Sequence, residues 1–428
     1  MKIKSAHIPI TAVTLGALAL RLWGINFGMP LITNFYIRPD ETLISIPTIH
    51  ILENSGNPGY FTYPALMMEI NAVFYYVRFA ILKLFGIVTA ANISSDFGSD
   101  MSPYVLISRC LSAVFSALTI LLTYKLARKI LDKPGAILAA AALTLSPLAC
   151  RVAHFGVTDS LVTLCEVGCI YTLIGYFTES ANFNKLCIAS VLYGLALASK
   201  YSAATLFPVL FLAVLFNNTS KTQKIKHIIT SATIPIITFL LCNPYILSEF
   251  NLFHSSMNST VGTLYYNNQP GIPIEQTIKQ ALIPLKYAPA GLLSIPLMLT
   301  AMFFYKNTRK KWFILTAFIF AFLPIISTRH LMPYRYAIPA LPYLAILVSL
   351  GINTMADIFK TDFKKVIYTG LTVSVLLPTL IFCIWNDILL SRPDTRTLAG
   401  EWIQQNASIN IPVAIAGWPE CEPQVPET

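Results

Sequence analysis

Residues 7–41 read HIPITAVTLGALALRLWGINFGMPLITNFYIRPDE, an apolar run followed shortly afterwards by two adjacent carboxylates, Asp40 and Glu41. The run at 7–27 is long enough to cross a bilayer as a helix, which takes ~20 mostly apolar residues. Carboxylates are too costly to leave against lipid, so this pair is expected to face water, a partner or a substrate. The stretch therefore predicts a membrane protein with an acidic site where a water-facing loop meets the membrane surface.

The composition of the whole chain agrees with that of its first segment. Of its 428 residues, 55% are hydrophobic and 12% are charged, whereas soluble domains carry about 25% charged residues. The net charge of +10 does not indicate nucleic acid, because excess Lys and Arg in a membrane protein usually mark cytoplasmic loops. Lys2 and Lys4 precede the first apolar run, but no convincing cleavage site follows, so this run is predicted to be a retained anchor.

Apolar segments of spanning length recur along the chain and predict an all-α, polytopic membrane protein with about eleven transmembrane helices. The stretch 64–90 is also long enough to cross, but Glu69, Arg78 and Lys83 interrupt it. We predict that it forms a juxtamembrane helix in the interface. The predicted spans are 7–27, 106–130, 134–150, 157–178, 186–200, 202–218, 227–247, 284–304, 312–328, 337–356 and 366–388.

Charged residues sort the predicted loops onto two sides. With eleven spans and the N-terminus inside, the cytoplasmic segments hold 17 of the 30 Lys and Arg but four of the 20 Asp and Glu, as the positive-inside rule expects. If 64–90 also crossed, the basic clusters at 125–133, 221–226 and 306–311 would face outward. We therefore predict a multi-pass protein of the plasma membrane, the inner membrane in bacteria, with a cytoplasmic N-terminus and an outer C-terminus.

Nearly all the unusual polar residues fall on the predicted outer side, where the loops 28–105 and 248–283 are long. Long loops between rigid spans commonly build sites. Any one basic residue there has the ordinary alternative of a helix-end side chain that reaches for the interface. The outer set consists of Arg38, Asp40, Glu41, Arg109, Arg151, His154, Asp159, Lys200, Tyr201, Arg329, His330, Arg335 and Tyr336.

Several members of this set have both a functional and a structural interpretation. Asp40 and Glu41 can act on a substrate, or can cap a short helix and occupy its first turn. Asp159 opens a predicted span and can also be a cap. Lys200 is a compact point charge suited to a phosphate, or a lysine that reaches for the interface. Arg335 can grip a phosphate through two parallel hydrogen bonds.

The cysteines indicate neither a metal site nor a disulfide framework, because no CxxC spacing occurs among them. Seven of the eight lie in or beside apolar segments and are predicted to be small buried hydrophobic residues. These seven are Cys110, Cys150, Cys165, Cys169, Cys187, Cys242 and Cys383.

Four stretches follow a pattern known from one group of membrane enzymes. They are RPDE at 38–41 with NPGYFTYP at 57–64, RCLSA at 109–113 in a span that ends YKLAR at 124–128, GLALASKY at 194–201, and RYAIPALP at 335–342. In order, spacing and sidedness, the chain over roughly residues 10–390 resembles the C-type glycosyltransferase superfamily (GT-C). The resemblance is to glycosyltransferase family 39, which holds the protein O-mannosyltransferases (dolichyl-phosphate-mannose-protein mannosyltransferases) and the lipid A aminoarabinose transferase.

The resemblance implies an enzyme that moves a sugar from a polyprenyl-phosphate donor to an acceptor hydroxyl on the extracytoplasmic side, with inversion at the anomeric carbon. It implies that Asp40 is the general base and that Glu41 and Asp159 lie near the site. It also implies that Lys200 and Arg335 hold the lipid phosphate. Further donor-binding candidates are Tyr336, His330 and Arg38. The implied partners are the membrane lipid donor and a protein, lipid or glycan acceptor, without nucleic acid, and no metal or other cofactor is required.

Two further groups of residues bear on these expectations. Aromatic side chains can line the sugar pocket or belong to the interfacial belt, and the candidates are Tyr60, Tyr63, Tyr265 and Tyr266. Residues 1–390 form the predicted transmembrane glycosyltransferase domain, and 391–428 form a short extracytoplasmic tail. Within the tail, 401–406 resembles the first helix of the family's C-terminal domain and 413–416 its first strand. So short a tail predicts a truncated or vestigial domain.

Two other functions remain open on the sequence. A flippase or transporter of lipid-linked sugars would need polar groups near mid-membrane in both halves of the chain, whereas the polarity here is one-sided. An inactive scaffold subunit would be consistent with the short tail.

Overall fold

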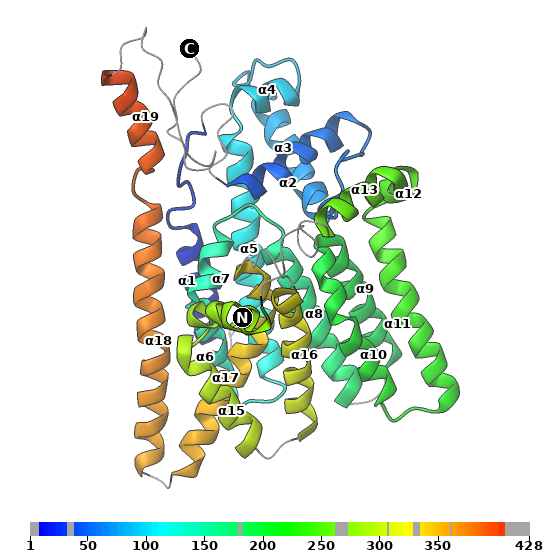
Figure 1. The fold of residues 1–428 in the computed structure, drawn as a ribbon, viewed down its shortest axis with the longest axis vertical. Helices are drawn as coiled ribbons and strands as arrows, with labels where there is room; N and C mark the ends of the chain where they lie inside the picture. The colour runs from blue at the N-terminus through cyan, green and yellow to red at the C-terminus, as the bar shows by residue number, and fades with distance from the viewer. Residues whose placement is uncertain are drawn as a thin grey trace, which may run out of the picture.

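The computed structural model describes residues 8–31, 38–178, 182–261, 273–305, 308–327, 334–359 and 362–406. Every regular element within these ranges is a helix, and none is a strand. Most of the helices run roughly parallel to one long axis and form a bundle (Figure 1). The predicted all-helical class is therefore confirmed.

Each predicted span overlaps a helix. By length and composition, five helices are able to cross a membrane, and the bent pair α6–α7 would make a sixth. Shorter apolar helices at Pro9–Leu22, Phe183–Ser199, Tyr201–Leu215 and Gly291–Phe304 lie beside them. The protein is therefore a multi-pass membrane protein, and a total of eleven spans stays a prediction. The overlapping helices are α1 (Ile8–Leu22), α5 (Ser102–Ala127), α6 (Lys133–Thr144), α8 (Asp159–Thr178), α9 (Phe183–Ser199), η1 (Tyr201–Leu206) with α10 (Phe207–Leu215), α11 (Lys221–Leu241), α15 (Ser294–Phe304), α16 (Thr308–Ser327), α17 (Leu341–Ile358) and α18 (Asp362–Leu390).

The predicted span 134–150 is not one continuous helix. Helix α6 ends at Thr144, and α7 (Pro147–Ala153) continues at an angle of 57° to it. The cause is Pro147, whose ring keeps the preceding residue out of the α region. Ser146 accordingly adopts an extended conformation with ψ of 115°. The bend carries α7 sideways across the upper part of the bundle.

Three helices of the first long loop gather at the upper end of the bundle (Figure 1). They are α2 (Pro39–Glu53), α3 (Leu66–Leu84) and α4 (Ile93–Ser99). One face of α3 is buried through residues such as Met68, Tyr75 and Phe79, and another exposes Phe74 and Ile81. This two-faced helix is not among those apolar enough to cross a membrane, so its placement in the interface remains our prediction.

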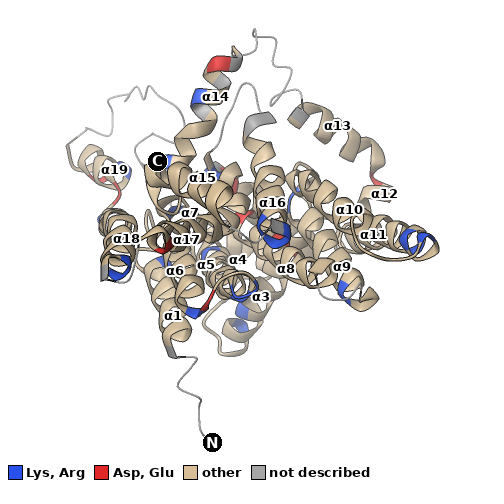
Figure 2. Ribbon diagram, turned by 90° about the horizontal axis from the view of Figure 1, so that it is seen from below, with Lys and Arg blue, Asp and Glu red and all other residues tan. Residues whose placement is uncertain are grey.

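The basic clusters predicted for one side of the membrane lie together at the lower end of the bundle. Figure 2, which looks onto that end, shows Lys and Arg near the ends of α11, α16 and α18. A hydrogen bond of 2.8 Å from the Lys310 ammonium to the Lys129 carbonyl joins two of the clusters directly. Helices α2 to α4 lie at the opposite end. The charge separation that the sequence predicts is thus present along the bundle axis.

Gly351 of α17 lies so close to the backbone of α15 that one added methyl group should strongly affect the stability of the protein. A Cβ on Gly351 would overlap the carbonyl oxygen of Leu297, and backbone cannot move aside as a flexible side chain can. We expect Gly351→Ala to destabilise the protein by about 1–3 kcal/mol, as overpacking does, in thermal unfolding of the detergent-solubilised protein. Gly370→Ala on α18 meets nothing within 4 Å and is the control. Equal unfolding temperatures of the two variants would contradict this packing.

Candidate active site

Asp40 lies in the first turn of α2, where it binds a cation from the far end of the sequence. Arg38 is the N-cap residue in an extended conformation, and no side chain caps the helix, so the alternative in which Asp40 is a cap is wrong. The carboxylate of Asp40 instead accepts hydrogen bonds from both terminal nitrogens of Arg335, one of them at 3.0 Å. The Tyr63 hydroxyl donates a further hydrogen bond of 3.3 Å to the same carboxylate.

Arg335 links Asp40 to a second acid–base pair. Its Nε lies 4.0 Å from a carboxylate oxygen of Asp159, and the other oxygen of Asp159 accepts a hydrogen bond of 2.7 Å from the Lys200 ammonium. The Lys200 ammonium also lies 4.5 Å from the centre of the Tyr336 ring. Acids and bases therefore alternate through a network drawn from α2, the start of α8, the α9–η1 junction and η5 (Tyr334–Ala340).

The two pairs differ in their exposure to solvent. The side chains of Asp40 and Arg335 remain 27% and 24% exposed, whereas that of Asp159 is 2% exposed. Burial acts to raise the pKa of Asp40, but the hydrogen bonds and charge of Arg335 overcome this effect and lower it below its usual value. Asp40 is therefore an accessible carboxylate that is ionised at neutral pH.

Glu41 faces away from Asp40 and is fully engaged elsewhere. Its two oxygens accept hydrogen bonds of 2.7 and 2.8 Å from Nε and Nη2 of Arg109, and one of them also accepts the Gly156 amide at 2.8 Å. The remaining nitrogen of Arg109 donates to the carbonyls of Ile25 and Phe27, both at 2.9 Å. This arrangement clamps α2, α5 and the loop before α8 around a buried ion pair.

A pocket of about 640 Å³ opens beside Asp40. Three guanidinium groups face it against one carboxylate, and Val152 and Phe155 supply apolar wall. The bend before α7 explains part of this wall, because it brings the residues of α7 to the site. The lining residues are Arg38, Asp40, Leu148, Arg151, Val152, Phe155, Val157, Tyr334 and Arg335.

Two of these arginines form no ion pair with a carboxylate in the described part of the chain. Within the part of the chain that the structure describes, no acid lies within ion-pair distance of Arg38 or Arg151. The Arg38 guanidinium stacks on the Phe155 ring at 4.1 Å. Burial and then the nearby charge of Arg151 lower the pKa of Arg38 to about 10. Two cations that repel each other in a half-buried pocket form a site that an anion would stabilise.

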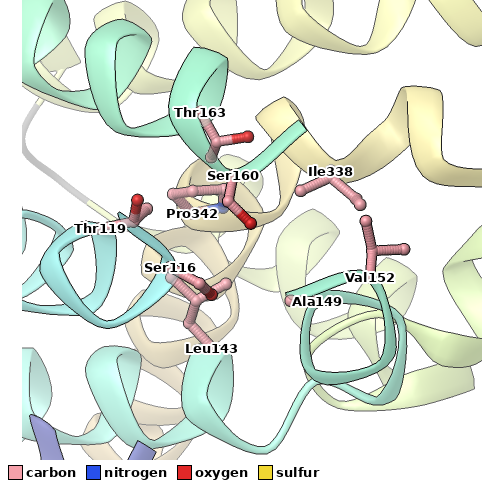
Figure 3. Close-up of a pocket in the computed structure, with 9 residues that line it drawn as sticks. All are labelled: Ser116, Thr119, Leu143, Ala149, Val152, Ser160, Thr163, Ile338 and Pro342. Carbon is pink, nitrogen blue, oxygen red and sulfur yellow. The ribbon is translucent and has the colours of Figure 1, made fainter. Parts of the chain in front are cut away.

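A second, deeper cavity of about 330 Å³ offers no such chemistry (Figure 3). Its lining carries the hydroxyls of Ser116, Thr119, Ser160 and Thr163, but no titratable group. The two threonine hydroxyls donate to backbone carbonyls of their own helices, and Ser116 accepts from Arg21. This cavity is therefore a packing space within the bundle.

The structure brings together five of the eight site residues predicted from the sequence: Asp40, Asp159, Lys200, Arg335 and Tyr336. Arg38 lines the adjoining pocket, whereas Glu41 does not. His330 lies outside the described residues, as do Tyr265 and Tyr266. The sequence included Arg151 among many outer residues without a role, and it could not separate Tyr63 from interfacial tyrosines. Neither Arg151 nor Tyr63 has a local sequence pattern that would identify it as a residue of the site.

Known proteins share this fold. Residues 105–247 match the family model of the dolichyl-phosphate-mannose-protein mannosyltransferases. The crystal structure of ArnT from Cupriavidus metallidurans, bound to undecaprenyl phosphate, is similar with a TM-score of 0.62 at 15% identity, over 96% of this chain and 82% of that one. The Archaeoglobus fulgidus oligosaccharyltransferase is similar with a TM-score of 0.59 at 12% identity, over 96% of this chain and 59% of that one. A search of curated proteins finds no match.

These likenesses concern one segment of the sequence and the fold of the chain. The similarity to ArnT and to the archaeal oligosaccharyltransferase is a similarity of fold. Residues 105–247, about a third of the chain, thus resemble the dolichyl-phosphate-mannose-protein mannosyltransferases, and the chain as a whole is similar in fold to ArnT.

Proposed function

We propose that this protein is an inverting glycosyltransferase that moves a sugar from a polyprenyl-phosphate donor to an acceptor hydroxyl on the extracytoplasmic side. The observation that carries the proposal is an ionised, accessible Asp40 on the wall of a pocket that three arginines line. The site lies at the end of the bundle opposite to the basic clusters, and the positive-inside rule assigns those clusters to the cytoplasm.

The pocket suits the phosphate of a lipid donor. Arg38 and Arg151 offer unbalanced positive charge, and a guanidinium matches phosphate oxygens through paired hydrogen bonds. The negative charge on the phosphate grows as the bond from sugar to oxygen breaks. Cations fixed at that oxygen therefore stabilise the transition state more than the bound donor. Two structures with this fold were solved with lipid phosphates, ArnT with undecaprenyl phosphate and the archaeal oligosaccharyltransferase with dolichol-phosphate.

Asp40 is the proposed base. In a one-step inverting transfer, the acceptor oxygen bonds to the anomeric carbon as the phosphate leaves from the other face, and the acceptor proton passes to Asp40. Arg335 keeps this carboxylate ionised but also weakens it as a base. A donor phosphate that attracts Arg335 would free Asp40 for the acceptor. The Tyr63 hydroxyl would hold the carboxylate in place during that exchange.

The second pair has a supporting role in this scheme. Asp159 lies against both Lys200 and Arg335, so we assign it to positioning Arg335 rather than to proton transfer. Lys200 gives one of its three N–H donors to Asp159, so its predicted phosphate contact would use another of them. Glu41 holds the backbone beside Asp40 through Arg109.

The pocket arginines predict the strength of donor binding. We expect Arg38→Ala and Arg151→Ala each to weaken binding of undecaprenyl phosphate by about 10-fold or more, since a hydrogen bond to a charged group contributes about 1.5–3 kcal/mol. Binding to the detergent-solubilised protein can be followed by thermophoresis or by competition with a fluorescent analogue. Arg392→Ala, which removes an exposed arginine just after α18, is the matched control. Unchanged affinity in both pocket variants would remove the phosphate site from Arg38 and Arg151.

The lipids that co-purify with the protein can identify the donor. Mass spectrometry of co-purifying lipids should detect a polyprenyl phosphate that carries a sugar, and in the Arg38→Ala/Arg151→Ala double variant the signal should fall. Reconstitution in liposomes separates the competing functions, because transfer to an acceptor defines the enzyme and flipping without transfer defines a transporter. A requirement for a second membrane subunit would favour the scaffold alternative.

A further inference from the structure

Two helices that lie far apart in the sequence present matching pairs of metal-ligating side chains to each other. Cys150 and His154 stand four residues apart at α7, and Cys383 and Asp387 stand four residues apart on α18. Residues at this spacing share one face of a helix. Helix α18 runs along the edge of the bundle and packs against α7 there (Figure 1). All four side chains are fully buried.

Three of these four groups converge on one point. One ligand atom each from Cys150, His154 and Asp387 lies within 4.8 Å of the other two. The thiol of Cys383, which interacts with Cys150, donates a hydrogen bond of 3.4 Å to the Leu145 carbonyl, so it would exchange this carbonyl for the metal to become the fourth ligand. Tetrahedral zinc has bonds of about 2.0–2.3 Å, which place its ligand atoms about 3.3–3.8 Å apart. Small rotations of these side chains would therefore close the group around one ion.

The imidazole of His154 faces hydrogen-bond acceptors on both sides. Its Nδ1 lies 2.9 Å from the Cys150 carbonyl, and its Nε2 lies 3.0 Å from the Trp23 carbonyl and 3.6 Å from an Asp387 oxygen. A neutral imidazole has one N–H, so one nitrogen must direct its lone pair at an oxygen. With Nδ1–H donating to the carbonyl, as in most histidines that bind metals, Nε2 is left directed at acceptors and requires a cation or a proton.

Asp387 gives a second, independent sign of an unfilled ligand position. Its Oδ1 accepts a hydrogen bond of 3.2 Å from Asn386, whereas its Oδ2 is buried and has no hydrogen-bond partner in the described part of the chain. A buried carboxylate oxygen without a partner is costly. The backbone also closes tightly here, since a Cβ on Gly24, which has φ of 77°, would meet the Leu390 Cβ at 2.9 Å.

We propose that Cys150, His154, Cys383 and Asp387 form a structural zinc site that joins α7 to α18. Two sulfurs, one imidazole nitrogen and one carboxylate are a ligand set that Zn²⁺ accepts in tetrahedral geometry. Binding releases the two thiol protons. One Zn²⁺, two thiolates, the carboxylate and the nearby guanidinium of Arg21 then sum to zero charge, which suits a fully buried position.

The site would fix the helix that carries part of the pocket wall. Leu148, Arg151 and Val152 of α7 line the pocket beside Asp40, while Cys150 and His154 of the same segment lie close to Asp387 of α18. The metal would hold Arg151 in position without contacting the substrate.

Metal analysis tests this proposal without an activity assay. Wild-type protein purified without chelators and incubated with zinc should hold about one Zn per chain by inductively coupled plasma mass spectrometry. The Cys383→Ser/Asp387→Asn variant should hold less than about a tenth of that amount. Cys187→Ser, which removes a half-buried cysteine on α9 outside the group, should keep the metal.

Cobalt loading gives a second readout for variants that fold poorly. Co²⁺ bound by the wild type should show the intense near-ultraviolet absorption of a cobalt–thiolate bond, and the Cys383→Ser single variant should lose part of it. Wild-type protein with no stoichiometric zinc and no such absorption would overturn the proposal. It would then assign Nε2 of His154 a proton, as an imidazolium paired with Asp387.

Discussion

Replacing Asp40 with Asn should lower the rate of sugar transfer by about 10²–10⁴-fold, the usual contribution of a general base, while donor binding changes little. The amide is almost isosteric with the carboxylate but cannot accept the acceptor proton. It can still accept a hydrogen bond from Arg335, which contacts both oxygens of Asp40 in the wild type. The measurement is single-turnover transfer from a radiolabelled polyprenyl-phosphate sugar in proteoliposomes.

The control for Asp40→Asn is Asp357→Asn, which removes an exposed carboxylate that pairs with Lys364 in the α17–α18 region. It should transfer sugar at the wild-type rate. The lowered pKa of Asp40 also predicts how sugar transfer depends on pH. The carboxylate should stay ionised as the pH falls to the ordinary aspartate value, near 3.9. Transfer by Asp40→Asn at the wild-type rate would remove Asp40 from the chemistry.

Glu41→Ala should have the largest effect on stability, a loss of about 3–5 kcal/mol, because it leaves a buried charge without its partner. Arg109 is fully buried, and two of its three nitrogens donate to Glu41. The Gly156 amide would lose its acceptor at the same time. Thermal and denaturant unfolding of the solubilised protein would measure the loss, and Arg109→Ala should give a loss of similar size.

A matched control for Glu41→Ala is Glu275→Ala, which breaks an exposed pair with Lys279 on α14 (Ile274–Leu282). Such exposed pairs contribute little, so its unfolding temperature should stay near that of the wild type. A Glu41→Ala protein as stable as Glu275→Ala would show that the ion pair with Arg109 does not hold α2 in place.

The adjacent carboxylates Asp40 and Glu41 show how much of the site can be predicted from the sequence. Their position after an apolar run predicts that they face water, a partner or a substrate. The sequence could not separate their roles, because their partners Arg335 and Arg109 lie 295 and 68 residues away from them. In the structure, Asp40 is an accessible acid, whereas Glu41 is buried in an ion pair with Arg109.

The cysteines show what a search for sequence motifs does not find. Spacing rules look for ligands that are close in sequence, and no CxxC is present. Cys150 with His154 and Cys383 with Asp387 each form only half of the four-ligand set that we propose. The contact between α7 and α18 that would complete the set depends on the bend at Ser146, which the predicted continuous span 134–150 lacked.

The sequence by itself determined the membrane class, the positions of the helices along the chain and the separation of basic loops from the polar site. These are local properties, since the length of an apolar run and the charge of a loop are fixed by neighbouring residues. Only the tertiary structure decided that Arg335 pairs with Asp40, that Lys200 pairs with Asp159, and that Arg38 and Arg151 line the pocket beside Asp40. Such pairings follow from how the helices pack, because packing brings together side chains that no local pattern connects.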